Sequence, residues 1–174
     1  NFEGWAKNTL LDSPLNFADE TGVNVNGHKL WFHLLSNNKV ALYQVDQKRG
    51  AEAMNRMGIL PHYTGILCHD HWKPYYTYNC VHSLCNAHHL RELQRAWEQD
   101  GQEWAKQLKQ LLVEINEKVK NSKSGHLSAE ELNFYQKRYR SILTRGKKEC
   151  PLNESNEKRG RTKQSKSRNL LDRL

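Results

Sequence analysis

The sequence predicts an α/β fold in which a mixed sheet is flanked by helices, and two observations support this class. Short segments rich in aromatic and β-branched residues occupy the first half of the chain. A long segment with helical periodicity follows them. A chain of 174 residues is long enough for a compact domain. Its apolar fraction of 37% is below the globular norm, so we expect part of the chain to stay unpacked.

Five short segments have the composition of strands: 17–23, 30–36, 40–45, 64–68 and 81–84. We expect the second and third to pair as an antiparallel hairpin, with Asn37 and Asn38 tolerating positive φ in the turn between them. A helix over 49–57, ending at Gly58, should connect this hairpin to the fourth strand. The fourth strand is short and apolar, as a strand buried on both faces should be.

Helical periodicity dominates residues 86–120, where large apolar residues recur three, four and seven positions apart. Gly101 is a candidate interruption of this helix. Ser128 stands three residues before Glu131, a capping box that should open a second helix and complete a helical hairpin. Segment 146–168 has no periodicity and almost no apolar residues, so we expect it to be disordered.

Strands joined by a hairpin come first and strands reached through helices come later, which implies antiparallel and then parallel pairing. This is the pattern of a ribonuclease H-like sheet, although the periodicity alone also fits other α/β sheets. We expect four parts: an N-terminal lead-in at 1–14, a truncated ribonuclease H-like core at 15–120, a helical insertion at 121–145, and a disordered basic segment with the start of a truncated helix at 146–174.

The positive charge is concentrated at one end of the chain. Residues 1–136 contain 14 Lys and Arg against 15 Asp and Glu, whereas residues 137–174 contain 13 against 4. The whole excess behind the net charge of +8 therefore lies in the last part. A basic tail on a neutral body predicts a polyanionic partner, and we favour nucleic acid over a merely solvated linker.

Composition also disfavours several classes of protein. No run of 18 apolar residues is present, which excludes a membrane-spanning helix, and the N-terminus has no secretory signal. The four cysteines lack the spacing of a disulfide framework, so we expect a reduced, cytoplasmic protein. Since the chain lacks an initiating Met, we expect it to begin inside a longer protein.

Two acidic residues stand where carboxylates are rarely found without a partner. Asp19 lies inside the first expected strand, where apolar neighbours should bury it, and Asp70 follows the fourth strand. In the expected sheet these strands are adjacent and parallel, so the two carboxylates can converge on one site. Hard oxygen ligands of this kind suit Mg²⁺ or Mn²⁺. The alternative is that Asp19 caps a turn and Asp70 caps a short helix.

Five stretches of sequence carry a family resemblance. They are Ala18-Asp19-Glu20-Thr21, His69-Asp70-His71-Trp72-Lys73-Pro74-Tyr75-Tyr76, Leu84-Cys85-Asn86-Ala87-His88-His89-Leu90-Arg91-Glu92-Leu93, Lys158-Arg159-Gly160-Arg161-Thr162-Lys163-Gln164-Ser165 and Asn169-Leu170-Leu171-Asp172-Arg173-Leu174. Their succession closely resembles bacterial transposases of the insertion sequence 66 family, which belong to the Asp-Asp-Glu class with a ribonuclease H-like core. The resemblance covers nearly all of the chain from about Leu15 onward.

This resemblance implies a function in DNA transposition and recombination. Asp19 and Asp70 match the first two catalytic acids, which in the family hold two divalent metal ions, normally Mg²⁺, for cleavage of transposon-end DNA and strand transfer. The third acid, a Glu, lies in the family on a helix beyond the last motif, so we expect the 174-residue chain alone to be inactive. The implied partners are transposon-end and target DNA, with homo-oligomers and helper proteins as further expectations, and the implied location is the bacterial cytoplasm.

Cys85 and His88 resemble a Cys-x-x-His element of such transposases, which implies a hydrogen-bonding role beside the metal site or a contact to DNA. A packed cysteine and a locally satisfied histidine are the alternative. A zinc site that adds Cys68 and Cys80 is disfavoured, because the spacing lacks the paired ligands of a zinc finger. In the basic segment, the residues expected to bind nucleic acid are Lys158, Arg159, Arg161, Lys163, Lys166 and Arg168.

Other assignments remain as alternatives. Glu92 and Glu114 lie on the long amphipathic helix, where exposed Glu is ordinary, so neither is favoured as the third acid. Four aromatic residues after Asp70 could stack on unpaired bases, although packing of the loop is favoured; they are Trp72, Tyr75, Tyr76 and Tyr78. The rival functions are a ribonuclease H-like nuclease that cuts without strand transfer and a non-catalytic DNA-binding module.

Overall fold

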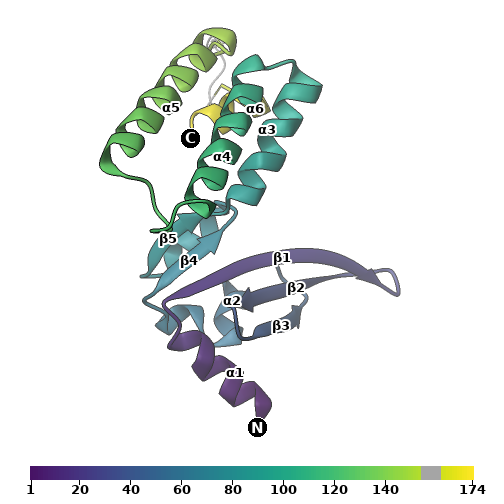
Figure 1. Cartoon of the computed structure of the whole chain (residues 1–174). Helices are drawn as coiled ribbons and strands as arrows, with labels where there is room; N and C mark the ends of the chain where they lie inside the picture. The colour runs from purple at the N-terminus through teal and green to yellow at the C-terminus, as the bar shows by residue number, and fades with distance from the viewer. Residues whose placement is uncertain (154–161) are drawn as a thin grey trace. The chain divides into compact units, whose positions relative to one another are not determined.

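The computed structural model describes residues 1–153 and 162–174, which form two compact units (Figure 1). Unit 1 comprises Asn1–Cys85 and unit 2 comprises Asn86–Leu174. The division falls where the last strand ends, and so differs from the expected boundaries after residues 120 and 145. The physical reason is that the helices after residue 86 bury their apolar faces in a core of their own.

In the described residues, unit 1 is built on a five-stranded mixed sheet with the order β3-β2-β1-β4-β5. The strands are β1 (Leu15–Val25), β2 (His28–Ser36), β3 (Ala41–Asp46), β4 (Ile66–His69) and β5 (Val81–Leu84). β2 pairs antiparallel with both β1 and β3, whereas β4 runs parallel to β1 and to β5. The predicted ribonuclease H-like mixed sheet is therefore confirmed, with β1 at its centre.

Asparagine closes the two antiparallel turns in different ways. Between β2 and β3, Asn37 Oδ1 accepts hydrogen bonds from two backbone N–H groups of the turn, at 2.8 and 3.0 Å. Neither Asn37 nor Asn38 has positive φ, so that detail of the prediction was wrong, because side-chain capping closes this turn instead. Between β1 and β2, Asn26 and Gly27 have φ of 51° and 83°, which is the conformation of a two-residue type I′ hairpin turn.

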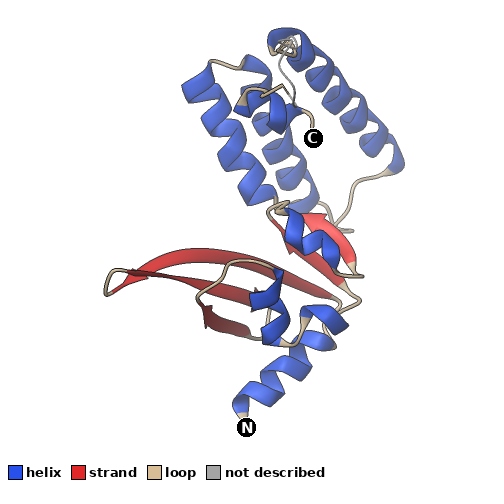
Figure 2. Cartoon of the chain, turned by 180° about the vertical axis from the view of Figure 1, so that it is seen from behind, coloured by secondary structure: helices blue, strands red, loops and turns tan. Residues whose placement is uncertain are grey.

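Helices α1 (Phe2–Leu11) and α2 (Ala51–Met57) complete the core of unit 1. α1 belongs to this core rather than to a lead-in, because Ala6 and Leu10 are fully buried in it. α2 ends at Gly58, as predicted, with φ of 75°. The short 3-10 helix η1 (Leu60–His62) lies in the loop before β4, and the short 3-10 helix η2 (Lys73–Thr77) lies in the loop after it. Figure 2 shows the β1–β2 hairpin reaching beyond the helices of unit 1.

Within its described residues, unit 2 is a bundle of four helices. They are α3 (Asn86–Asp100), α4 (Glu103–Lys120), α5 (Ala129–Glu149) and α6 (Lys166–Leu171). Gly101, with φ of 65°, separates α3 from α4 and confirms the predicted interruption. Ser128 and Glu131 form the predicted capping box at the start of α5. No helix in the described part of the chain is long and apolar enough to cross a membrane.

The predicted disorder of 146–168 is wrong for the parts of that segment that the structure describes. α5 continues through Gly146 because that residue lies against the buried indole of Trp104, where a larger side chain would not fit. Ser165 caps α6 by accepting a hydrogen bond from the backbone N–H three residues later (3.0 Å), and α6 buries Leu170 in the core of unit 2. Residues 154–161, which the prediction also covered, lie outside the described residues.

Candidate active site

The parallel pairing of β1 with β4 aligns the two candidate carboxylates. The paired residues are Leu15 with Ile66, Asn16 with Leu67 and Phe17 with Cys68. Continuing the same register by two residues places Asp19 opposite Asp70, at the carboxyl end of β4. Burial, then Glu20, and then these two aspartates raise the pKa of Tyr75 far above its usual range. The sheet thus supplies the adjacency that a shared metal site needs.

Each candidate carboxylate uses one oxygen for a local hydrogen bond. Asp19 Oδ1 accepts from Glu20 N (2.9 Å), and Asp70 Oδ1 accepts from Trp72 N (2.9 Å). The second bond closes the turn before η2, but Asp70 is not the cap of that helix, because its N-cap position is Trp72 and carries no side-chain capping bond. Within the described residues, Oδ2 of either aspartate makes no hydrogen bond, so turn capping leaves an oxygen available to a cation.

Asp19 is exposed, so the expectation that its neighbours would bury it was wrong. Along β1 the buried positions are Asn16 and Ala18, whereas Phe17 and Asp19 point to the opposite face of the sheet. Glu20 takes the buried position instead, with 1% of its side chain exposed. The apolar residues around two adjacent acids did not indicate which of them faces the core.

Glu20 ties β1 to the loop that carries Asp70. Its Oε1 accepts hydrogen bonds from Arg49 Nη2 (2.5 Å) and Nε (3.0 Å), and its Oε2 accepts from Tyr75 Oη (2.5 Å). The Arg49 guanidinium also lies over the ring of Trp72, 4.2 Å from its centroid. Since Trp72 N is the donor to Asp70, one charged network connects β1, which carries Asp19, with the loop that carries Asp70.

Replacing Arg49 with Met should lower the free energy of unfolding by about 2–3 kcal/mol, because the buried Glu20 carboxylate loses its cation. We place the value below that of a fully buried pair, since 40% of the Arg49 side chain is exposed. Urea unfolding followed by circular dichroism measures the change. Lys48→Met is the matched control: its pair with Glu52 is largely exposed, so its loss should stay under about 0.5 kcal/mol. Equal losses would contradict a special role for the buried pair.

A second network orders the end of β4. His69 is fully buried, and its Nδ1 accepts a hydrogen bond from His71 N (3.2 Å), which leaves Nε2 as the donor to His82 Nδ1 (3.0 Å). His82 Nε2 in turn donates to Tyr78 O (3.3 Å). Burial, followed by the charge of His82, lowers the pKa of His69 to about 4, so this imidazole stays neutral near pH 7. No spacing in the sequence indicates this network, because its members come from separate strands and loops.

The aromatic residues after β4 mostly pack the loop. Tyr75 and Tyr78 are buried, and Trp72 meets the ring of Tyr75 edge-on at a centroid distance of 5.8 Å. Tyr76 is more exposed, and its Oη lies 2.5 Å from Nδ1 of His71, a residue with φ of 72°. The packing alternative is therefore confirmed for Tyr75 and Tyr78, and base stacking is not proposed for them.

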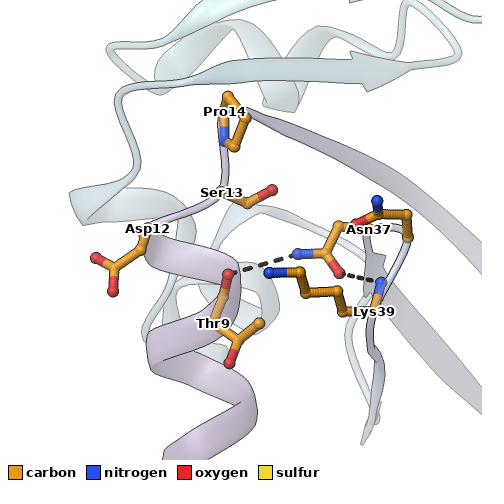
Figure 3. Close-up of a pocket in the computed structure, with 7 residues that line it drawn as sticks. Thr9, Asp12, Ser13, Pro14, Asn37 and Lys39 are labelled. Carbon is orange, nitrogen blue, oxygen red and sulfur yellow. Dashed lines mark hydrogen bonds between the residues drawn. The ribbon is translucent and has the colours of Figure 1, made fainter.

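Asp19 does not line the larger hollow that the structure describes in unit 1. A hollow of about 450 Å³ in unit 1 is lined by the end of α1 and the β2–β3 turn. Figure 3 shows that the Asn37 side chain, which belongs to this lining, is hydrogen-bonded to Thr9 and to Lys39. Pro14, the residue before β1, also lines this hollow. Asp19 lies further along β1, at a distance from Pro14 of about 17 Å if each residue advances by the usual rise of a β-strand. Asp19 instead lines a shallow depression of about 90 Å³.

Cys85 and His88 lie on either side of the boundary between the two units. Cys85 N donates to His69 O (2.8 Å), and burial, together with the Cys85 thiol, raises the pKa of Cys68 to about 11. His88 Nδ1 is buried and has no hydrogen-bond partner among the described residues. Neither observation assigns these two residues to the metal site.

The candidate acids on the helices of unit 2 form ion pairs. Glu92 lies 2.6 Å from Arg173, and Glu114 lies 2.6 Å from Arg138. In residues 1–153 and 162–174, no three His, Cys, Asp or Glu side chains are grouped so that they could hold a metal ion. The described residues therefore offer no group of three or more such ligands, and Asp19 and Asp70 remain a candidate pair.

The residues expected to bind nucleic acid differ in their surroundings. Arg168 is buried, and it donates from Nη1 to Cys150 O (2.9 Å) and from Nε to Asp172 Oδ1 (3.0 Å). These bonds hold α6 to the end of α5, so the assignment of Arg168 to DNA was wrong. Lys163 and Lys166 are exposed. Three further residues, Lys158, Arg159 and Arg161, lie outside the described residues.

The strand order of unit 1 makes the chain a ribonuclease H-like protein. A family model described as "Transposase IS66 family" matches residues 3–174, which is essentially the whole chain. The chain belongs to this transposase family. A search of curated proteins gave no match.

Solved structures similar to the chain include two from retroviral assemblies. One is the simian T-cell lymphotropic virus intasome in complex with PP2A regulatory subunit B56 gamma, with 11% identity, a TM-score of 0.35, and coverage of 93% of this chain and 55% of that chain. The other is the HTLV-2 integrase catalytic core domain in complex with magnesium, in trimeric form, with 15% identity, a TM-score of 0.35, and coverage of 85% and 92%. The chain thus spans about half the length of the intasome chain that it matches.

Proposed function

We propose that this chain supplies Asp19 and Asp70 as two of the three acids of a DNA transposase active site. The reaction is metal-dependent cleavage of transposon-end DNA followed by transfer of the cut strand to a target. The observation that supports the proposal is the parallel register of β1 and β4, because continuing it by two residues would bring Asp19 opposite Asp70. Membership of a transposase family supports the reaction class.

The donor set fits a divalent cation such as Mg²⁺ or Mn²⁺. Asp19 and Asp70 each retain a carboxylate oxygen outside the local hydrogen bonds, and Asp19 is open to solvent and hence to substrate phosphates. Two such ions in the complete site would supply Lewis-acid activation of the attacking oxygen and stabilisation of the leaving oxygen. The role of this chain is to hold the two carboxylates in place. The Glu20–Arg49 pair contributes by fixing the loop that carries Asp70 relative to β1.

The remaining elements of the site follow from the family resemblance. We place the third acid, a Glu, beyond Leu174, so that the 174-residue chain by itself should not cleave DNA. Cys85 and His88 keep their proposed role as hydrogen-bonding groups near the metal site or as DNA contacts. Nδ1 of His88 has no hydrogen-bond partner among the described residues, so it can still form the hydrogen bond that this role requires.

Contacts to DNA outside the metal site are proposed for basic residues near the C-terminus. Lys163 and Lys166 remain in this set, and with them Lys158, Arg159 and Arg161. Such residues would bind phosphates without sequence preference. Homo-oligomers, helper proteins and a bacterial cytoplasmic location remain predictions.

Titration of the ¹⁵N-labelled chain with Mn²⁺ tests the metal site. A paramagnetic ion shared by the two carboxylates should broaden amide resonances near both Asp19 and Asp70, and excess Mg²⁺ should restore them. Asp19→Asn should remove the broadening at both positions. Asp12→Asn, which neutralises another exposed aspartate of unit 1, is the matched control and should leave it unchanged.

Two results would overturn this assignment. Broadening centred on Glu92 or Glu114 would move the metal to unit 2, where both acids form ion pairs. Broadening near Asp70 that persists unchanged in the Asp19→Asn chain would show that the two acids do not share an ion.

A further inference from the structure

We propose that the outer face of α5, in unit 2, is a further DNA-binding surface, which holds the phosphate backbone of duplex DNA through residues other than the two aspartates. The basic stripe, as we name it, consists of Lys137, Arg140, Arg145, Lys147 and Lys148. All five residues are exposed. The identity of the ligand as DNA rests on the proposed function, whereas the surface itself rests on the charges and packing of unit 2.

The helix fixes which way these side chains point. α5 buries Tyr135, Ile142 and Gly146 in the bundle, at spacings that define one face. At 100° per residue, Lys137 and Lys148 lie on the opposite side, and the other stripe residues flank them. α5 packs on α4 at the edge of the bundle, so this outer side is not an internal surface (Figure 1).

Within the part of the chain that the structure describes, no acidic side chain neutralises the charge of the basic stripe. Residues 132–148 contain no Asp or Glu. Among the described residues, no acidic side chain lies within ion-pair distance of any stripe residue. The nearby acids are engaged elsewhere: Glu114 pairs with Arg138, and Glu149 Oε2 accepts a hydrogen bond from Trp104 N (3.1 Å) at the start of α4. Exposed cations without partners create a local positive potential that attracts a polyanion.

A groove beside the stripe adds hydrogen-bond donors. It has a volume of about 390 Å³, lies between α4 and α5, and contains Gln107, Gln110, Ser141 and Arg145 in its lining. Amide, hydroxyl and guanidinium groups all donate to phosphate oxygens. The acid in the same lining is Glu114, which already has its arginine partner. The groove therefore offers donors on the side where the basic stripe offers charge.

The dimensions match a duplex backbone. Lys137 and Lys148 are separated by eleven residues, or about 17 Å along the helix axis. About five phosphates of one DNA strand occupy that length of duplex. Lysine and arginine on a helix face contact such phosphates without reading bases, so binding should show no sequence preference. An acidic protein segment is less well matched, because unpaired cations spread over about 17 Å of one straight helix fit a rigid polyanion with evenly spaced charges better than a flexible chain.

Fluorescence anisotropy with a labelled 30-base-pair duplex of arbitrary sequence tests the proposal. Measurements in EDTA keep the metal site out of the experiment, so failure here is distinct from failure of the proposed active site. If about four stripe residues neutralise phosphates, log K should fall with log salt at a slope of about −3.6 from this surface alone, which is roughly a 150-fold loss of affinity between 50 and 200 mM salt. Replacing all five stripe residues with Gln should remove that contribution.

Two matched variants make the result specific. The first removes five charges from α4 and its C-terminal end by changing Lys106, Lys109, Lys118, Lys120 and Lys123 to Gln. The second changes the C-terminal basic residues Lys158, Arg159, Arg161, Lys163 and Lys166 to Ser. A stripe variant that keeps its helical circular dichroism but loses more slope than the α4 variant supports the proposal.

Three outcomes would overturn it. An unchanged salt slope in the stripe variant would show that α5 does not touch DNA. Equal losses in the stripe and α4 variants would show that binding follows net charge only. Binding of polyglutamate that is as tight as DNA binding and is lost in the same variant would assign the basic stripe to an acidic protein.

Discussion

Asp70→Asn, introduced into a transposase polypeptide that extends beyond Leu174 to the third acid, should lower the rate of DNA-end cleavage by about 10³-fold or more. The carboxamide keeps the shape of the side chain and its hydrogen bond from Trp72 N, but it removes one negative charge from the ligand set. Metal-ion catalysis of phosphoryl transfer supplies several kcal/mol, and each 1.36 kcal/mol is tenfold in rate. Cleavage of labelled duplexes carrying the ends of the encoding element measures the loss.

The controls separate chemistry from binding and folding. Asp12→Asn should leave the rate within about twofold, because this aspartate is exposed and lies outside the site. Asp70→Asn should also leave the urea midpoint and the affinity for DNA in EDTA nearly unchanged. Robust Mg²⁺-dependent nicking by the 174-residue chain, abolished by Asp70→Asn, would contradict the proposed third acid beyond Leu174.

The sheet of unit 1 was predictable because its information is local. The strands show short apolar or β-branched runs, and the order of hairpin and helical connections restricts the topology to few possibilities. The turn at Asn26–Gly27 carried an additional signal, because an Asn-Gly pair favours the type I′ hairpin turn that the structure contains. The alternation of buried residues along β1 was not predictable, since Asp19 and Glu20 are adjacent acids within one apolar segment.

The candidate site was predictable only in part for a related reason. Asp19 and Asp70 were located by motifs that lie along the sequence. The network that supports them depends on contacts between residues far apart in the chain: Arg49 and Tyr75 are 29 and 55 residues from Glu20. No spacing rule connects such residues before the sheet and its loops are folded. Long-range polar contacts of this kind decide where charge is buried, and sequence periodicity does not report them.

The prediction for the C-terminal part of the chain was wrong for a different reason. Composition predicted disorder after residue 146, because apolar residues are sparse there. A few well-placed residues were enough to order the described part: Ser165 caps α6, and Leu170 and Leu171 enter a core that already holds Trp104. Average hydrophobicity cannot detect this, because it counts apolar residues without regard to the cavity that each one fills.

Gly146→Leu should therefore destabilise unit 2 by about 3 kcal/mol or more. A Cβ at residue 146 would lie 2.8 Å from Cγ of Trp104 and 3.0 Å from Cδ1 of Leu171. Trp104 is fully buried and cannot move aside without disturbing its neighbours, so overpacking outweighs the roughly 1 kcal/mol by which a better helix former would stabilise α5. Urea unfolding measures the loss, and hydrogen exchange should show α6 losing protection first, since Leu171 contacts the altered position.

Thr144→Leu is the matched control, because it places the same side chain on the exposed face of α5, two residues earlier. Its effect should stay within about 0.5 kcal/mol. If residue 146 instead marked the start of a disordered segment, the two variants would unfold at the same urea concentration, because neither leucine would meet a packed core. A large loss confined to Gly146→Leu would establish that the chain remains folded at this position, and that α6 is held by α5 through a contact only glycine permits.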